Sequence, residues 1–183
     1  MEKEGQPEVP RAEMAGEKKR LDAVVLAEAL LDYALKPAGP ELEREFSPHY
    51  LDELLFFKMF TVDYVLGLKS VNNPLFASVR QHYNGEIEKG CMGSSRLRIF
   101  YETAVARFAT YSEACNANTL APKECKGERI VFWELGKAFS CLASDADPWV
   151  PSALEVTLHA NIFLRECKRL SDFLEQCDIA QTV

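Results

Sequence analysis

Ionisable side chains recur along one apolar stretch of the chain, residues 47–68, in a pattern that could surround a ligand. The stretch reads SPHYLDELLFFKMFTVDYVLGL and is apolar at most positions. On a helical wheel only one sector of about 100° is polar. That sector contains His49, Asp52, Glu53, Asp63 and Gly67. Because a helix this apolar must be covered by others on most sides, its polar sector is the first place to look for functional groups.

Asp63 differs from the other acidic residues of this stretch because it does not lie near a helix end. Asp52 and Glu53 lie in the first turn, where the helix dipole favours carboxylates, whereas Asp63 lies three turns beyond Asp52. An isolated buried carboxylate is very costly, so a buried Asp63 requires a partner. The candidate partners, from a later helix, are Arg107, Tyr101 and Tyr111.

Two interpretations of Asp63 stay open. In the first, it belongs to a structural ion pair or to an exposed polar stripe. In the second, it forms one wall of a pocket for a small polar ligand, together with a histidine and nearby aromatic side chains. The ligand-binding residues that this second interpretation predicts are Asp63, His49, Phe56, Phe60 and Tyr64.

Histidine and carboxylate spacings give only weak indications of a metal site. A ferritin-like di-metal centre needs Glu-x-x-His on two helices, and none of the three histidines has a glutamate three residues before it. The nearest approximations are His49 with Asp52 and Glu53, and a later set of Glu155, His159 and Glu166. Glu155 is already explained as the partner of Ser152 in a capping box. We therefore predict no metal centre and no cofactor.

Short catalytic and nucleotide-binding motifs are absent from the chain. It contains no GxSxG, GxGxxG or GxxxxGK[ST] pattern, the signatures of α/β-hydrolases, dinucleotide-binding folds and P-loops. The formal net charge is −7, whereas nucleic-acid binding requires clustered lysines and arginines that neutralise phosphates. We therefore predict no nucleic-acid partner.

Composition also indicates the compartment. No apolar run approaches the roughly 18 to 20 residues that a membrane helix needs. The polar N-terminal residues contain no apolar core of a secretory signal. The chain has no CxxC pair, and Cys115, Cys141, Cys167 and Cys177 fall at apolar positions of helical patterns, which is typical of reduced core cysteines. We predict a cytoplasmic protein with no membrane partner.

Helical periodicity and capping signals predict an all-α protein. The expected helices span residues 18–35, 48–68, 75–83, 96–117, 129–143 and 153–177, and no segment alternates with the period of a strand. Ser47-Pro48 and Asn73-Pro74 are expected to begin helices, and Asn84-Gly85 to end one. The prediction is a single-domain helical bundle over residues 18–183, built around the buried central helix 48–68. Residues 1–17 are expected to form a disordered polar tail.

The helix expected at 153–177 bears on function. Its apolar residues alternate at spacings of four and three over three heptads, which is typical of a bundle seam as well as of a coiled coil. With no catalytic motif present, we predict a non-catalytic protein-interaction or regulatory module that binds a protein partner or a second copy through residues 153–177. The alternative is a helical-bundle protein or enzyme that binds a small ligand or metal in a pocket against the central helix.

Overall fold

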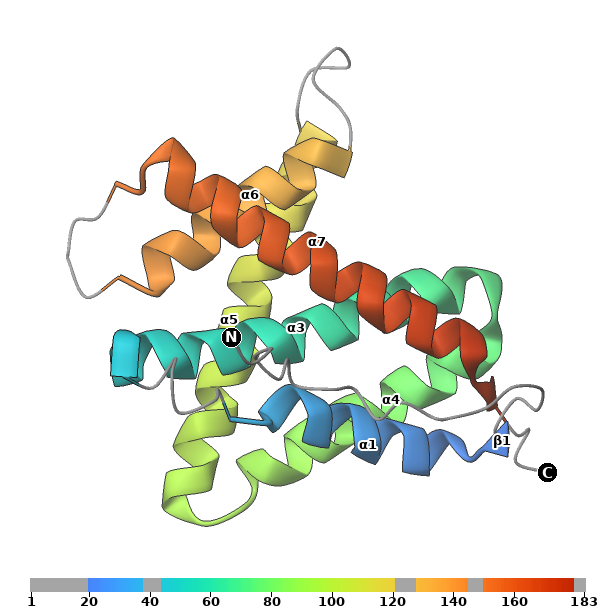
Figure 1. Cartoon of the computed structure of the whole chain (residues 1–183). Coiled ribbons are helices and arrows are strands. Elements are labelled where there is room, and N and C mark those ends of the chain that lie inside the picture. Colours follow the sequence, from blue (N-terminus) through green and yellow to red (C-terminus); the bar gives the residue numbers. More distant parts are fainter. Residues whose placement is uncertain (1–19, 38–43, 121–127, 145–149, 180–183) are drawn as a thin grey trace, which may run out of the picture.

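The computed structural model describes residues 20–37, 44–120, 128–144 and 150–179, in which six long helices make up nearly all of the fold (Figure 1). They are α1 (Ala23–Leu35), α3 (Pro48–Asn72), α4 (Pro74–Cys91), α5 (Ser95–Leu120), α6 (Glu128–Leu142) and α7 (Ala153–Gln176). The predicted all-α, single-domain bundle is confirmed. The predicted polar tail, residues 1–17, lies outside the described residues.

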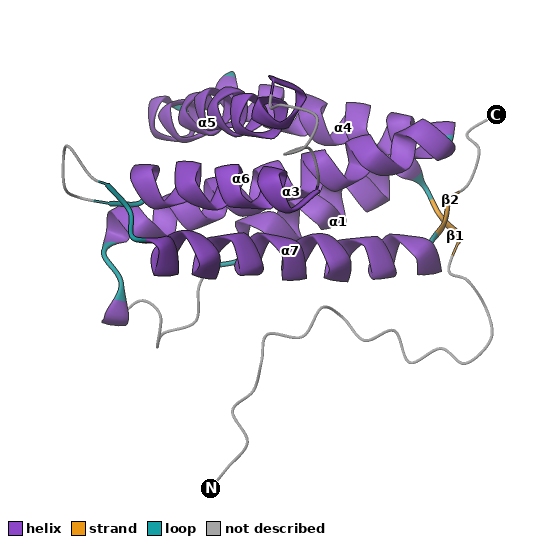
Figure 2. Ribbon diagram, turned by 90° about the horizontal axis from the view of Figure 1, so that it is seen from above, coloured by secondary structure: helices purple, strands orange, loops and turns teal. Residues whose placement is uncertain are grey.

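Helix α3 is the central helix, as the sequence predicts. Figure 2 shows α7 on one side of it and α4 and α5 on the other, and α1 and α6 pack against it as well. Its apolar side chains divide between two hydrophobic clusters. Met59 and Val62 belong to the cluster that includes α1 and α4, whereas Phe57 and Phe60 belong to the cluster with α5, α6 and α7. The central helix therefore joins the two halves of the core.

Capping interactions explain where the helices begin. The Ser47 hydroxyl accepts a hydrogen bond from the main-chain N–H of Tyr50 (3.2 Å) at the start of α3. Asn73 caps α4 in the same way. Ser152 and Glu155 form the predicted capping box in front of α7. All three of these helix starts satisfy main-chain donors that would otherwise lack partners.

The third predicted helix is longer than expected. Asn84-Gly85 was predicted to end it, but α4 continues to Cys91. The Asn84 side chain donates a hydrogen bond to Asp63 (3.0 Å), and Ile87, one turn later, is buried in the core. These contacts hold the segment in a helix despite the low helix propensity of Gly85, which costs about 1 kcal/mol relative to alanine.

Two short strands depart from the prediction of no sheet. Strand β1 (Arg20–Leu21) pairs in parallel with β2 (Asp178–Ile179), so that Leu21 lies opposite Ile179. Ile179 is buried in the first hydrophobic cluster. The pairing brings the start of α1 beside the end of α7. Strands of two residues are too short for a period-two pattern to be recognised in a sequence.

The apolar seam of α7 faces the interior of the bundle. Val156, Phe163, Leu170 and Leu174 are buried. The seam is therefore used in packing within one chain. Within the described ranges, no helix has both the length and the hydropathy needed to cross a membrane.

The cysteine prediction holds for most of the described residues but not for Cys141. Cys115, Cys167 and Cys177 are partly buried. Burial raises the pKa of Cys115 and of Cys167 to about 12. Cys141 is exposed, because it shares the outer side of α6 with Lys137 rather than the core side with Phe139.

Candidate functional site

Asp63 is buried and ion-paired. Its two carboxylate oxygens accept hydrogen bonds from Nε and Nη2 of Arg80 on α4, each at 2.7 Å, and Asn84 donates a third. The predicted partners from α5 were therefore wrong. The short turn at Asn73 folds α4 back along α3, which places Arg80 beside Asp63.

A second buried carboxylate, Glu53, has two of the partners predicted for Asp63. The Tyr111 hydroxyl donates to Oε1 (2.7 Å) and Arg107 Nε donates to Oε2 (2.8 Å), and the Glu53 side chain is only 1% exposed. Burial and the charge of Glu53 raise the pKa of Tyr111. From the sequence, Glu53 was explained only by its first-turn position, where the helix dipole favours a carboxylate. The spacing of Arg107 and Tyr111, four residues apart on one helix face, is the signal that could have found this site.

His159 is the centre of a buried chain of hydrogen bonds that joins three helices. Its Nδ1 lies 2.7 Å from the Ser140 hydroxyl on α6, and its Nε2 lies 3.2 Å from the Tyr50 hydroxyl on α3. Ser140 donates its own proton to the Gly136 carbonyl (2.7 Å). A neutral imidazole that donates from Nδ1 and accepts at Nε2 satisfies every member of the chain. Burial lowers the pKa of His159, against the charge of Glu155, which raises it.

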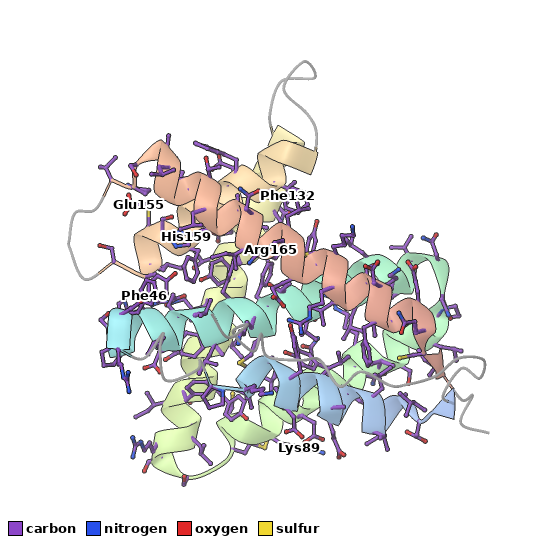
Figure 3. The ribbon with its side chains drawn as sticks, viewed as in Figure 1. Phe46, Lys89, Phe132, Glu155, His159 and Arg165 are labelled. Carbon is purple, nitrogen blue, oxygen red and sulfur yellow. The ribbon has the colours of Figure 1, made fainter. Side chains whose placement is uncertain are left out.

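The weak metal-ligand candidates on α7 each have a separate partner. Glu155 binds Ser152 in the capping box, and His159 lies in the hydrogen-bond chain; both residues are labelled in Figure 3. Glu166 accepts a hydrogen bond from the hydroxyl of Tyr33 on α1. His159 and Glu166 are roughly 10 Å apart along the helix axis. No group of three or more His, Cys, Asp or Glu side chains that could hold a metal ion occurs among the described residues.

The residues predicted to line a ligand pocket are spread along α3. His49 is exposed and lies roughly 21 Å along the axis from Asp63. Phe56 and Phe60 are buried in different hydrophobic clusters, and Tyr64 packs against both. The structure therefore brings none of the aromatic residues together with both His49 and Asp63.

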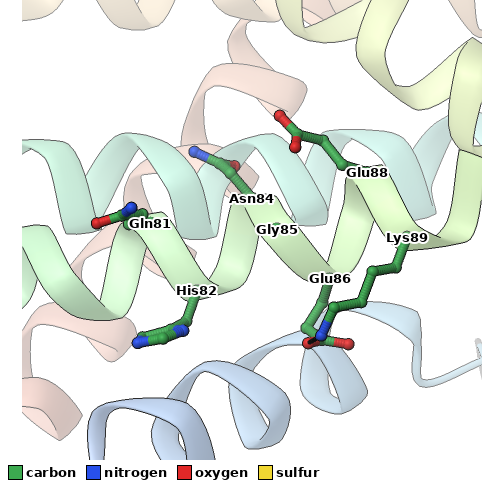
Figure 4. A pocket seen from close by; sticks show the side chains of 7 residues that line it. All are labelled: Gln81, His82, Asn84, Gly85, Glu86, Glu88 and Lys89. Carbon is green, nitrogen blue, oxygen red and sulfur yellow. Dashed lines mark hydrogen bonds and ion pairs between the residues drawn. The ribbon is translucent and has the colours of Figure 1, made fainter.

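A surface depression of about 520 Å³ lies along α4 (Figure 4). Its lining residues are Gln81, His82, Asn84, Gly85, Glu86, Glu88 and Lys89. All of them belong to one helix, and Glu86 and Lys89 are paired with each other. None of the predicted ligand-binding residues lines this depression, although Asn84 at its edge binds Asp63.

A polar cluster that the sequence does not predict lies where α1, α3 and α7 meet. Tyr33 binds Glu166, and the Lys58 ammonium donates to the main-chain carbonyl of Lys36 (3.3 Å). Burial lowers the pKa of Lys58; Glu166 raises it, and the charges of Lys36 and Arg169 lower it further. Burial and Glu166 raise the pKa of Tyr33, whereas Arg169 lowers it. We call Tyr33, Lys36, Lys58, Glu166 and Arg169 the junction cluster.

Comparisons with protein-family models, with curated proteins and with solved structures find no match to the chain. Within the described part of the chain, no buried side-chain nitrogen or oxygen lacks a hydrogen-bond partner. The buried polar groups around α3 therefore already have partners inside the fold.

Proposed function

We propose that the chain is a non-catalytic protein-interaction module that binds another protein through the outward face of α7. The observation that carries the proposal is a line of exposed apolar side chains on that face. Leu154 and Leu158, one turn apart, are 79% and 57% exposed, and Val150, just before the helix, is 85% exposed. Single exposed apolar residues are ordinary, but an aligned set is typical of an interaction surface.

The core occupies the opposite face of α7. On a helical wheel, Leu154 and Leu158 lie roughly 180° from the buried Val156 and Phe163. The apolar seam predicted for residues 153–177 is used inside the bundle, so a partner that binds this helix meets the outward face instead.

The charges along the same face suggest the chemistry of the partner. Arg165 and Lys168 follow Leu158 on the outward side (Arg165 is labelled in Figure 3), and both are exposed. Neither forms an ion pair with any residue in the described ranges. A partner helix that carries apolar residues followed by carboxylates complements both halves of this face.

A second copy of the chain fits this face less well. In an antiparallel pair of α7 helices, contact between the two leucine pairs requires a two-fold axis near residue 156. Contact between Arg165 and the exposed Asp172 requires an axis between residues 168 and 169. These registers differ by roughly three turns, so no single arrangement satisfies both. Two copies with a net charge of −7 also repel each other.

Site-specific photo-crosslinking tests the proposal. The full chain would carry a photoreactive phenylalanine analogue at position 158 or, as the control, at position 71, because Val71 is also an exposed apolar residue (81%) and lies at the end of α3. We expect a single cross-linked partner protein from position 158 and none from position 71. This partner, once purified, should bind the native chain and a Val71→Glu variant, but not the double variant that carries both Leu154→Glu and Leu158→Glu.

Two results would contradict the proposal. Cross-links of equal yield from both positions would show non-specific contact. A product that consists of two copies of this chain, together with a dimer seen by light scattering, would show that this face mediates self-association and does not bind an acidic partner helix.

A further inference from the structure

We propose that the turn between α4 and α5 docks on the surface of a membrane that contains anionic lipids. The docking region is residues 89–99, which we call the α4–α5 tip; in Figure 1 it is the light-green turn at the bottom of the view. The sequence predicts no membrane partner because it contains no spanning segment, and surface docking requires none. Since α4 and α5 lie on the opposite side of α3 from α7 (Figure 2), membrane contact leaves the outward face of α7 free.

The α4–α5 tip is an exposed projection of the bundle. Eight consecutive residues, 92–99, are exposed. The turn is nevertheless ordered, because the main-chain N–H of Met92 donates to the carbonyl of Lys89 (3.1 Å). Gly90 lets α5 approach α4 closely, since a Cβ atom there would overlap the ring of Tyr101. The tip is therefore a preformed convex surface, and it can meet a bilayer without rearrangement.

Three apolar side chains surround the α4–α5 tip. Met92 is 85% exposed, Ile99 62% and Leu97 54%. On a helical wheel Leu97 and Ile99 lie roughly 160° apart, so the apolar surface surrounds the start of α5 and forms no stripe along it. A partner helix binds along a stripe, whereas apolar groups around a projecting end suit insertion at the boundary between headgroups and acyl chains. The arrangement therefore favours a bilayer over a partner helix.

The charge of the α4–α5 tip complements an anionic surface. Residues 89–101 contain three cations and no carboxylate, although the net charge of the chain is −7. Arg96 is exposed and forms no ion pair with any residue in the described ranges. Lys89 and Arg98 each pair with a glutamate of their own helix, but both cations are more than half exposed, and such pairs are weak in water. All three cations are therefore available to anionic headgroups within a Debye length.

Flotation of the full chain with lipid vesicles tests the inference. We expect binding to phosphatidylcholine vesicles that contain about one quarter phosphatidylserine, and at least about tenfold weaker binding to pure phosphatidylcholine vesicles. The double variant Met92→Ser, Ile99→Ser should bind the anionic vesicles at least about tenfold more weakly than the native chain. Its matched control, Leu68→Ser, Val71→Ser, changes two exposed apolar residues at the end of α3 and should bind like the native chain.

A second pair of variants tests the charge of the α4–α5 tip. Arg96→Gln should weaken binding to the anionic vesicles about fivefold, which is the contribution of one cation near such a surface. Arg44→Gln removes an exposed arginine just before α3 and is the matched control. We expect its binding to equal that of the native chain. Higher salt should weaken the binding of the native chain more than that of Arg96→Gln.

Stability and assembly measurements complete the test. Because all the substituted side chains are exposed, each variant should unfold at the urea concentration of the native chain. The inference is overturned by absence of binding to the anionic vesicles, by equal binding to both lipid compositions, or by equal weakening in the two serine double variants. A dimer seen by light scattering without lipid, and lost in Met92→Ser, Ile99→Ser, would assign the tip to a second copy of the chain. The partner cross-linked from position 158 should bind this variant normally, so that either proposal can fail without the other.

Discussion

Arg80 and Asp63 form a two-point ion pair in which each carboxylate oxygen accepts one guanidinium N–H at 2.7 Å. The pair joins α3 to α4. Glu53, ten residues earlier on α3, pairs with Arg107 and so joins α3 to α5. Two carboxylates of the central helix therefore fix its register against two different neighbours.

We expect Asp63→Asn to lower the free energy of unfolding by about 2 kcal/mol. Loss of one partner from a fully buried pair costs about 3 to 5 kcal/mol, and solvent screening reduces that here, because the Arg80 side chain is 42% exposed. Urea unfolding measures the change. Glu102→Gln is the control, since Glu102 and Arg98 are both exposed and 3.7 Å apart, and we expect it to cost less than about 0.5 kcal/mol. Similar small losses in both variants would contradict a structural role for Asp63.

Glu53→Gln should cost more than Asp63→Asn, about 3 kcal/mol, because it leaves Arg107 as a partly buried cation without a carboxylate. Tyr111→Phe removes only a hydrogen bond to the same carboxylate and should cost about 1 to 2 kcal/mol. Chemical unfolding of the two variants gives the comparison. A larger loss in Tyr111→Phe than in Glu53→Gln would show that the ion pair is not the main contribution.

Acidification should destabilise the bundle partly through His159. Burial lowers the pKa of His159 in the folded chain below its usual 6.5, so the unfolded chain binds the proton more readily. Stability therefore rises with pH through the range below 6.5 and is lost as the pH falls through it. The unfolding free energy would be measured at about pH 7.5 and about pH 5.5, on either side of the usual histidine pKa.

In that comparison, His159→Gln should show a smaller difference between the two pH values than the native chain. His82→Gln is the control, because His82 is exposed on α4, and its difference should match that of the native chain. An unchanged difference in His159→Gln would assign the acid sensitivity to other groups.

Gly136 allows α6 and α7 to approach closely. A Cβ atom there would lie 2.5 Å from the Val156 carbonyl oxygen and 2.8 Å from the Ala160 nitrogen, whereas a Cβ at Gly85 would meet nothing within 4 Å. We expect Gly136→Ala to destabilise the fold by about 1 to 3 kcal/mol, because two main chains must move apart. Gly85→Ala should stabilise it by about 0.5 to 1 kcal/mol, through helix propensity. Thermal unfolding of the pair checks both signs, and shifts in the same direction would contradict the close approach at Gly136.

Local features of this fold could be predicted from the sequence because local chemistry determines them. Ser47 and Asn73, each followed by proline, begin helices for reasons contained in a few residues. The burial of α3 on most of its sides follows from its own composition. The end of α4 could not be predicted in this way, since Gly85 remains helical only because Asn84 and Ile87 contact other helices.

Contacts between helices depend on their order and crossing, which periodicity does not determine. Asp63 was correctly singled out as a carboxylate that needs a partner if buried, yet Arg107 binds Glu53 instead. The junction cluster escaped prediction for the same reason. In the sequence, Lys58 is only an interruption of an apolar helix. In the structure, its ammonium donates to the carbonyl of Lys36 at the end of α1, and the charge of Glu166 on α7 raises its pKa.

The parallel pairing of β1 with β2 gives the bundle a mechanical clasp. Since the two strands run in the same direction, a force that pulls on the chain before Arg20 and after Ile179 slides one strand along the other. Such shear loads the hydrogen bonds of the pair together instead of opening them one after another. Ile179 is also anchored in the core. Because α1 and α7 both lie between these strands in the sequence, a stretched chain must break the clasp before tension can unwind either helix.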